Sequence, residues 1–186
     1  MTLVPLFDGQ DPMIHVVQGE FAIANDPGVV LTTVLGSCVA VCMRDPGAGV
    51  GGMNHFLLPG GKPGEGSSVV YGVNAMELLI NALLKAGARR SHLEAKIFGG
   101  ATMLESIRNI GASNIEFALK FLETERIPCI GRSVGGSLAR RVKYWPVTGR
   151  ARQRQMQETD LREIDLPINK PAAPSAPPTD DDIEFF

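Results

Sequence analysis

The chain has 186 residues, of which 44% are hydrophobic and 20% charged, and its net charge is −2. This balance is typical of one globular domain with a substantial core, and it excludes a largely disordered chain. The small net charge argues against a nucleic acid partner. No apolar run approaches the about 18 residues that cross a bilayer, and residues 1–5 lack the basic stretch and apolar core of a signal peptide. We therefore expect a cytoplasmic protein with no membrane insertion.

Short apolar and β-branched runs, separated by turn sequences, fill the first third of the chain. The first 19 residues contain proline and glycine without a regular period and are predicted to be a loosely attached lead-in. Strands are predicted at 21–24, 29–35 and 39–43. A further strand over 50–58 follows the turn Asp45-Pro46-Gly47, which predicts a hairpin.

Two helical segments follow a glycine-rich loop at 60–66. The first helix is predicted over 74–86, and Gly87 is expected to terminate it. Its apolar face is formed by Leu78, Leu79, Ala82 and Leu83. The second is predicted to begin at a capping box of Ser113 and Glu116 and to run to about Thr124.

Strands are predicted around and after the second helix, at 92–98 and 127–133, with a last hairpin formed by 141–147 and 151–155. Many short strands and two helices indicate the α+β class, with the helices on one side of packed sheets.

The chain changes character near its C-terminus. Proline and alanine dominate residues 171–178, and the last seven residues are acidic and then aromatic. Such a segment cannot form a packed core. We predict a folded domain over 20–166 and a disordered, Pro-rich acidic tail over 167–186.

Three cysteines are too few and too irregularly spaced for a disulfide framework, so an inert thiol is the default for each. Cys38 differs because it follows Gly36-Ser37, a pair that permits a tight turn and leaves space above the thiol. If the strand stays extended to residue 38, alternation places Thr32 rather than Thr33 beside Cys38.

His55 lies on the returning strand of the predicted hairpin, within side-chain reach of Cys38 if the strands are antiparallel. Taken alone, the pair also fits a buried cysteine and a histidine bonded to a backbone carbonyl. Cys38, Cys42 and His55 lack the fourth ligand of a zinc site. We expect neither a metal nor another cofactor.

Two sequence blocks, Leu35–Val41 (LGSCVAV) and Gly52–Pro59 (GMNHFLLP), resemble the signature of the chemoreceptor glutamine deamidases, the CheD family. The resemblance continues through 96–101 and 109–114 and through Gly135-Gly136 followed by Arg140. It covers roughly residues 16–150.

The resemblance implies a catalytic Cys38, a base His55, and Thr32 as the residue that orients the imidazole. Gly36, Ser37 and Asn54 are expected near the substrate or its oxyanion. The family implies a layered α/β/β sandwich, with two main helices on one side of mixed and antiparallel sheets.

The implied function is hydrolysis of glutamine side-chain amides to glutamate, through a thioester, on methyl-accepting chemotaxis receptors. The implied partners are the cytoplasmic helical bundle of those receptors and, as a candidate, a CheC-type phosphatase. Two alternatives stay open. A cysteine peptidase or acyltransferase would use the same cysteine and histidine, and a non-catalytic chemotaxis adaptor would need neither.

Charge is unevenly distributed in the last third of the chain. Residues 132–154 include seven basic and no acidic residues, whereas residues 158–186 include eight acidic and two basic ones, a net of −6. The simpler interpretation is that the basic hairpin is an ordinary solvated surface and that the acidic tail only increases solubility. The alternative is a basic surface that docks the acidic receptor bundle, with the tail competing for it.

Overall fold

The computed structural model describes residues 12–58, 66–102 and 108–156. Its elements in chain order are β1 (Met13–His15), β2 (Phe21–Ala24), β3 (Val30–Leu35), β4 (Val39–Asp45), β5 (Val50–Phe56), α1 (Gly66–Lys85), a 3₁₀ turn (Arg90–His92), β6 (Glu94–Gly99), α2 (Arg108–Thr124), β7 (Cys129–Val134), β8 (Ala139–Tyr144) and β9 (Ala151–Met156).

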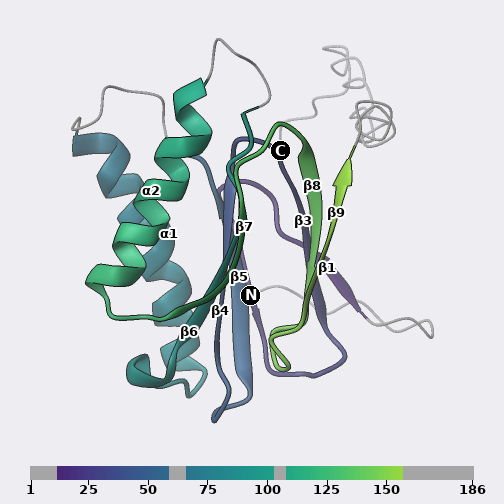
Figure 1. Ribbon diagram of the computed structural model, residues 1–186. Helices are drawn as coiled ribbons and strands as arrows, with labels where there is room; N and C mark the ends of the chain where they lie inside the picture. The colour runs from purple at the N-terminus through teal and green to yellow at the C-terminus, as the bar shows by residue number, and fades with distance from the viewer. Residues whose placement is uncertain (1–11, 59–65, 103–107, 157–186) are drawn as a thin grey trace, which may run out of the picture.

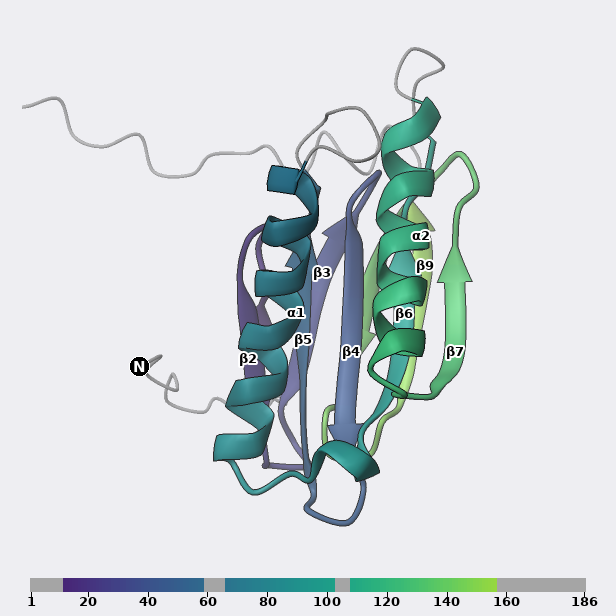
Figure 2. The same ribbon diagram turned by 90° about the vertical axis from the view of Figure 1, so that its left-hand side faces the viewer.

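These elements form three layers (Figure 1). A central sheet has the strand order β2-β5-β4-β6-β7, and an outer sheet has the order β1-β3-β8-β9. Both helices cover one face of the central sheet (Figure 2), and the outer sheet packs on its other face. The pairs β1–β3 and β6–β7 are parallel and the other pairs antiparallel. The predicted α/β/β sandwich is confirmed.

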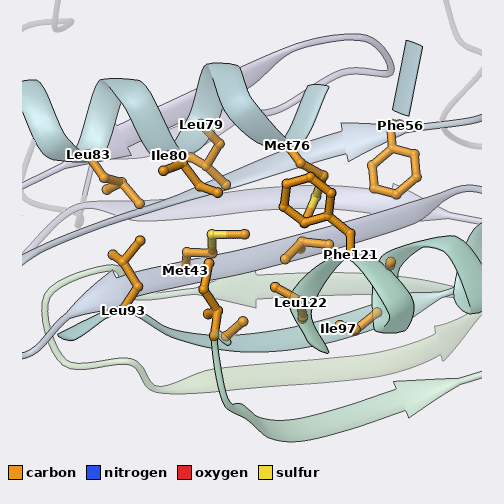
Figure 3. Close-up of a cluster of buried hydrophobic side chains, with 14 of the residues drawn as sticks. Met43, Phe56, Met76, Leu79, Ile80, Leu83, Leu93, Ile97, Phe121 and Leu122 are labelled. Carbon is orange, nitrogen blue, oxygen red and sulfur yellow. The ribbon is translucent and has the colours of Figure 1, made fainter. Parts of the chain in front are cut away.

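One hydrophobic core lies between the helices and the central sheet (Figure 3). Each strand presents alternate residues to this layer, as the two-residue period of a strand requires. Its fully buried members include Met43, Phe56, Leu79, Ile97 and Leu122. Burial of each such side chain stabilises the fold by about 1.5–3 kcal/mol.

A second core fills the space between the two sheets. The outer sheet contributes Leu31 and Leu35 from β3, and the central sheet contributes Ala40 and Met53 from β4 and β5. On β5, therefore, Met53 and His55 face the outer sheet, whereas their neighbours Asn54 and Phe56 face the helices. This alternation decides which polar residues reach the space between the sheets.

All the strands predicted from the sequence are present, with ends shifted by a few residues. The hairpins β4–β5 and β8–β9 are confirmed by their antiparallel registers. Within the described residues, no helix is long and apolar enough to cross a membrane.

The lead-in prediction is wrong for residues 13–19. Residues 13–15 form β1, which pairs with β3, and the backbone N–H of Val16 donates to the carbonyl oxygen of Thr32 at 2.9 Å. A strand of only three residues is too short to show an alternating pattern. Residues 1–11, the glycine-rich segment 59–65 and the predicted tail lie outside the described residues.

Two helix predictions are also wrong in detail. Leu78 was expected in the core but is 46% exposed, since α1 instead buries Met76, Leu79, Ile80 and Leu83. The second helix begins at Arg108, so Ser113 lies inside it and does not cap it.

Candidate active site

The chain crosses from the outer sheet to the central sheet through Gly36, Ser37 and Cys38, between the end of β3 and the start of β4. The carbonyl oxygens of all three residues accept hydrogen bonds. Gly36 accepts from the backbone N–H of Ala101 at 2.8 Å and Cys38 from that of Gly100 at 2.7 Å. Ser37 accepts from the side-chain amide of Asn114 at 2.8 Å. The turn that presents the thiol is therefore fixed at three points.

Gly99 permits this turn to approach the end of β6. Its φ of +105° is in the region that favours glycine, and a Cβ built there would collide with the carbonyl oxygen of Cys38. Any other residue at position 99 would strain its own backbone and displace the cysteine.

The Cys38 thiol is half-buried at the margin of the core between the sheets. Burial raises the pKa of the Cys38 thiol, and a hydrogen bond from its own backbone N–H offsets part of that rise. Its Sγ donates to Oε1 of Gln18 at 3.3 Å. Burial therefore disfavours the thiolate form of Cys38.

His55 is opposite Ala40 in the β4–β5 register and lies on the same face of β5 as Met53, toward the space between the sheets. Cys38 directly precedes β4 and packs against the core that fills this space. His55 is only 6% exposed, and burial lowers the pKa of its imidazole. Among the described residues, its Nε2 atom has no hydrogen-bond partner.

The other ring nitrogen, Nδ1, is held by two oxygens. It lies 2.9 Å from Oγ1 of Thr33 and 3.2 Å from the carbonyl oxygen of Val16. The Thr33 hydroxyl donates its own proton to that same carbonyl at 2.7 Å, which leaves Oγ1 as an acceptor. Nδ1 must then carry the ring proton, and Nε2 presents its lone pair.

The prediction that Thr32 orients the imidazole is wrong. The Thr32 hydroxyl donates to the carbonyl oxygen of Val142 at 2.9 Å, and Thr33 contacts the ring instead. Thr33 shares the inward face of β3 with Leu31 and Leu35. Counting alternate residues from 38 back to 32 fails because the chain changes sheets at Gly36.

The prediction for Asn54 is also wrong as far as its side chain is concerned. The Asn54 amide lies on the helix side of β5, accepting from the backbone N–H of Val41 at 3.0 Å and donating to the carbonyl oxygen of Ala75 at 3.1 Å. It cannot border a substrate on the opposite face. That Gly36 and Ser37 lie near the substrate or its oxyanion stays a prediction.

Asn114 of α2 is a site residue that the sequence analysis missed. It is fully buried, and while its Nδ2 donates to Ser37, its Oδ1 accepts from the backbone N–H of Leu58 at 2.8 Å. One amide therefore joins the cysteine turn to the segment that leaves β5 after His55. The sequence does contain a sign of this role. Asn114 lies one turn before Ala118, so a polar residue stands on the apolar face of the helix.

The remaining cysteines are unsuited to catalysis here. Cys42 is 1% exposed, and burial raises the pKa of its thiol well above the usual range. Cys129 is exposed at the start of β7. Cys42 is two residues from Ala40, the residue opposite His55, so its burial and not its register sets it apart, whereas β4 and β6 separate the β7 strand of Cys129 from β5.

A half-buried thiol and a buried imidazole that border the same space between two sheets are the groups on which cysteine hydrolases and acyltransferases rely. Residues 57–155 match the family model described as CheD chemotactic sensory transduction. The chain belongs to the CheD family.

Curated relatives match nearly the whole chain. The probable chemoreceptor glutamine deamidase CheD of Rhizobium johnstonii is 51% identical over 96% of this chain and 98% of its own. The proteins of that name from Rhizobium meliloti and Caulobacter vibrioides are 53% and 51% identical, each over 93% of this chain and over 95% and 92% of their own. Among solved structures, the Bacillus licheniformis hypothetical protein YfiH aligns with a TM-score of 0.43 and 14% identity, over 68% of this chain and 60% of its own.

Proposed function

We propose that this protein is a cytoplasmic glutamine deamidase that hydrolyses glutamine side-chain amides of chemotaxis receptors to glutamate and ammonia. The names of its relatives support the reaction and the substrate. The observation that supports the mechanism most directly is the arrangement around His55, whose Nδ1 is bonded to Thr33 and Val16 while its Nε2 is left with a lone pair.

The first step is proton transfer from Cys38 to Nε2 of His55. Both groups rest in their neutral forms, because burial disfavours the thiolate and the imidazolium alike. The proton therefore moves as the sulfur attacks the carboxamide carbon. Thr33 and Val16 accept from Nδ1 and hold the ring in place during this transfer, as the third member of a triad does.

Attack forms a bond between Sγ and the carboxamide carbon and places negative charge on the amide oxygen. The backbone N–H groups of Ser37 and Cys38 are the proposed donors to this oxyanion. The supporting observation is that the three carbonyl oxygens of the turn are already bonded to Gly100, Ala101 and Asn114, so the turn is held rigidly.

Collapse of the tetrahedral intermediate breaks the carbon–nitrogen bond. His55 returns its proton to the departing nitrogen, and ammonia leaves a thioester on Cys38. His55 then takes a proton from a water molecule that hydrolyses the thioester, releasing glutamate and the free thiol.

The proposed substrate segment is the cytoplasmic helical bundle of methyl-accepting chemotaxis receptors, and a CheC-type phosphatase is a proposed regulator. Conversion of glutamine to glutamate adds one negative charge per site and creates a methylation site. The enzyme would in this way tune receptor signalling and adaptation.

The test is intact-mass spectrometry of a purified receptor cytoplasmic fragment incubated with the enzyme. Each deamidation adds about one dalton, and ammonia appears in equal amount without peptide cleavage. Cys38→Ala and His55→Ala should each lower the rate by about a hundredfold or more. A folded Cys38→Ala protein with undiminished activity would refute the mechanism, and cleaved receptor would indicate a peptidase.

A further inference from the structure

A glutamine of the chain itself lies against the candidate nucleophile. Gln18 follows β1, and its Oε1 accepts the thiol proton of Cys38 at 3.3 Å. The Gln18 side chain is otherwise exposed to solvent. Its carboxamide has the same chemistry as the group that the proposed deamidase would act on.

The backbone around Gln18 is fixed to the base. The carbonyl oxygen of Val16 contacts Nδ1 of His55, and the N–H of Gly19 donates to the carbonyl oxygen of His55 at 2.7 Å. The N–H of His55 in turn donates to the carbonyl oxygen of Glu20 at 3.0 Å. Gln18 therefore starts from a segment that is bonded to His55 on both sides, and its side chain extends from there to Cys38.

In this contact Gln18 occupies the position beside the thiol but is not placed to be attacked by it. The thiol donates a hydrogen bond to the amide oxygen, whereas attack requires the sulfur to lie above the carboxamide carbon. The thiol proton also points to Gln18 while Nε2 of His55 has no partner among the described residues. With Gln18 in this position, the thiol is hydrogen-bonded to the carboxamide and not to His55, so the S–H must turn before the proton can transfer.

We infer that Gln18 is an intramolecular pseudosubstrate, whose carboxamide occupies the place of the substrate carboxamide at Cys38 until a receptor glutamine displaces it. This inference rests on the proposed deamidase function. Displacement frees the thiol proton to turn toward His55, so substrate binding and activation of the nucleophile occur together.

The occupant is weakly held, because a thiol is a poor hydrogen-bond donor and Gln18 is exposed. It reduces the fraction of enzyme that is open to substrate, and the apparent KM is the intrinsic value divided by that open fraction. For a contact of this strength we expect an effect of about two- to fivefold.

The experiment uses Gln18→Met in the full-length protein, since methionine keeps the length of the side chain and removes the carboxamide. The exposed Cys129 is replaced by alanine in every protein, so that alkylation by iodoacetamide reports Cys38. Asn81→Met on α1 is the matched control, because Asn81 is an exposed carboxamide on the helix layer.

Gln18→Met should lower KM for the receptor fragment by about two- to fivefold at unchanged kcat, and should speed alkylation of Cys38 by a similar factor. Asn81→Met should change neither. An unchanged or raised KM, a reduced kcat, or unchanged alkylation would overturn the inference. If the parent enzyme failed to add mass to the receptor, the proposed function would fail, whereas the alkylation rates would still test the occupancy of Cys38.

Discussion

At the residue scale, the groups that contact Nδ1 of His55 are both uncharged. They are the hydroxyl of Thr33 and the backbone carbonyl of Val16. In the proposed triad they take the place of the third member. A carboxylate in that place would stabilise an imidazolium and favour a thiolate–imidazolium ion pair. Thr33 and Val16 orient the ring without supplying that charge. The pKa of the Cys38 thiol is raised and that of His55 is lowered, both mainly by burial, and both shifts favour a neutral pair over a thiolate–imidazolium pair.

This neutral pair predicts a specific pH dependence. His55 must be unprotonated to act as a base, and its pKa lies below the ordinary 6.5. The acid limb of kcat/KM should therefore lie below pH 6.5, with more than half of the maximal value retained at that pH. Alkylation of Cys38, which follows the thiolate, should keep rising with pH past the ordinary thiol pKa of 9.0. An alkylation rate already at its plateau near neutral pH would contradict a neutral pair.

The adjacent threonines of β3 allow a matched test of ring orientation. Each is almost fully buried and each donates to a backbone carbonyl, so valine at either position should cost similar stability. Thr33→Val should also lower kcat by about tenfold, equivalent to ~1.4 kcal/mol for one orienting hydrogen bond. Thr32→Val should leave kcat nearly unchanged. If Thr32→Val and Thr33→Val lost the same rate of ammonia release at the same stability, Thr33 would have no specific role in orienting the imidazole.

These residues show what a single sequence can predict about the site. Cys38 and His55 were predicted from a small-residue turn, an antiparallel hairpin and the family resemblance, and the structure has the predicted turn between β3 and β4 and the β4–β5 hairpin. The choice between Thr32 and Thr33 depended on where the chain leaves one sheet for the other. That crossing is a tertiary feature, and alternation within a strand carries no information about it.

At the element scale, two buried asparagines connect the helices to the central sheet. Asn54 of β5 joins β4 to α1 through Val41 and Ala75, and Asn114 of α2 joins the cysteine turn to the segment after β5. Each satisfies one backbone donor and one backbone acceptor. They differ in that only Asn114 bonds directly to the residue beside Cys38.

Replacing each asparagine by leucine should distinguish a contribution to the stability of the fold from a contribution to the position of the Cys38 thiol. Both variants leave backbone groups without partners and should lower the free energy of unfolding by about 1–3 kcal/mol per unsatisfied group. Asn114→Leu should in addition reduce kcat, because the Ser37 carbonyl loses its anchor and the thiol loses its fixed position. The measurement is ammonia release at a temperature where circular dichroism shows both variants folded. An equal loss of kcat in Asn54→Leu would mean that Asn114 acts through stability alone.

The differences between predicted and observed elements also have local causes. β1 was missed because three residues cannot display a period, yet it carries Val16 to the ring of His55. The start of α2 was placed five residues late because Ser113 and Glu116 have the spacing of a capping box. Tertiary contacts outweighed that signal, since Gly111 packs against the backbone of Gly100 and could not do so with a Cβ.

At the scale of the whole molecule, basic side chains are concentrated on the hairpin of β8 and β9. Lys143 is opposite Arg152 in the register, and Arg141 lies on the same face of β8 as Lys143. Like charges on directly opposed residues are unfavourable unless an anion is nearby. Arg140 does not belong to this surface, because it is 4% exposed and donates to the carbonyl oxygens of Ser133 and Gly135.

This surface would attract an acidic partner, and both the receptor bundle and the acidic segment Asp180–Glu184 of the same chain are candidates for binding it. The segment lies outside the described residues, but its tether gives it an effective concentration on the order of mM. Competition between the two would raise the apparent KM for receptor at low ionic strength, where surface charges are least screened. The same competition would not affect kcat, since the hairpin carries none of the proposed catalytic groups.

Deletion of residues 168–186 should therefore lower KM for the receptor fragment at low salt, with little effect at high salt and no change in kcat. The Gln18→Met effect should differ, because a contact between a thiol and a carboxamide involves no net charge and should persist at both salt concentrations. Measuring KM for the parent, the truncated protein and Gln18→Met at two ionic strengths separates the two forms of competition. Identical salt-dependent KM values for the parent and truncated proteins would exclude the tail as a competitor and leave the basic hairpin as a docking surface for the receptor alone.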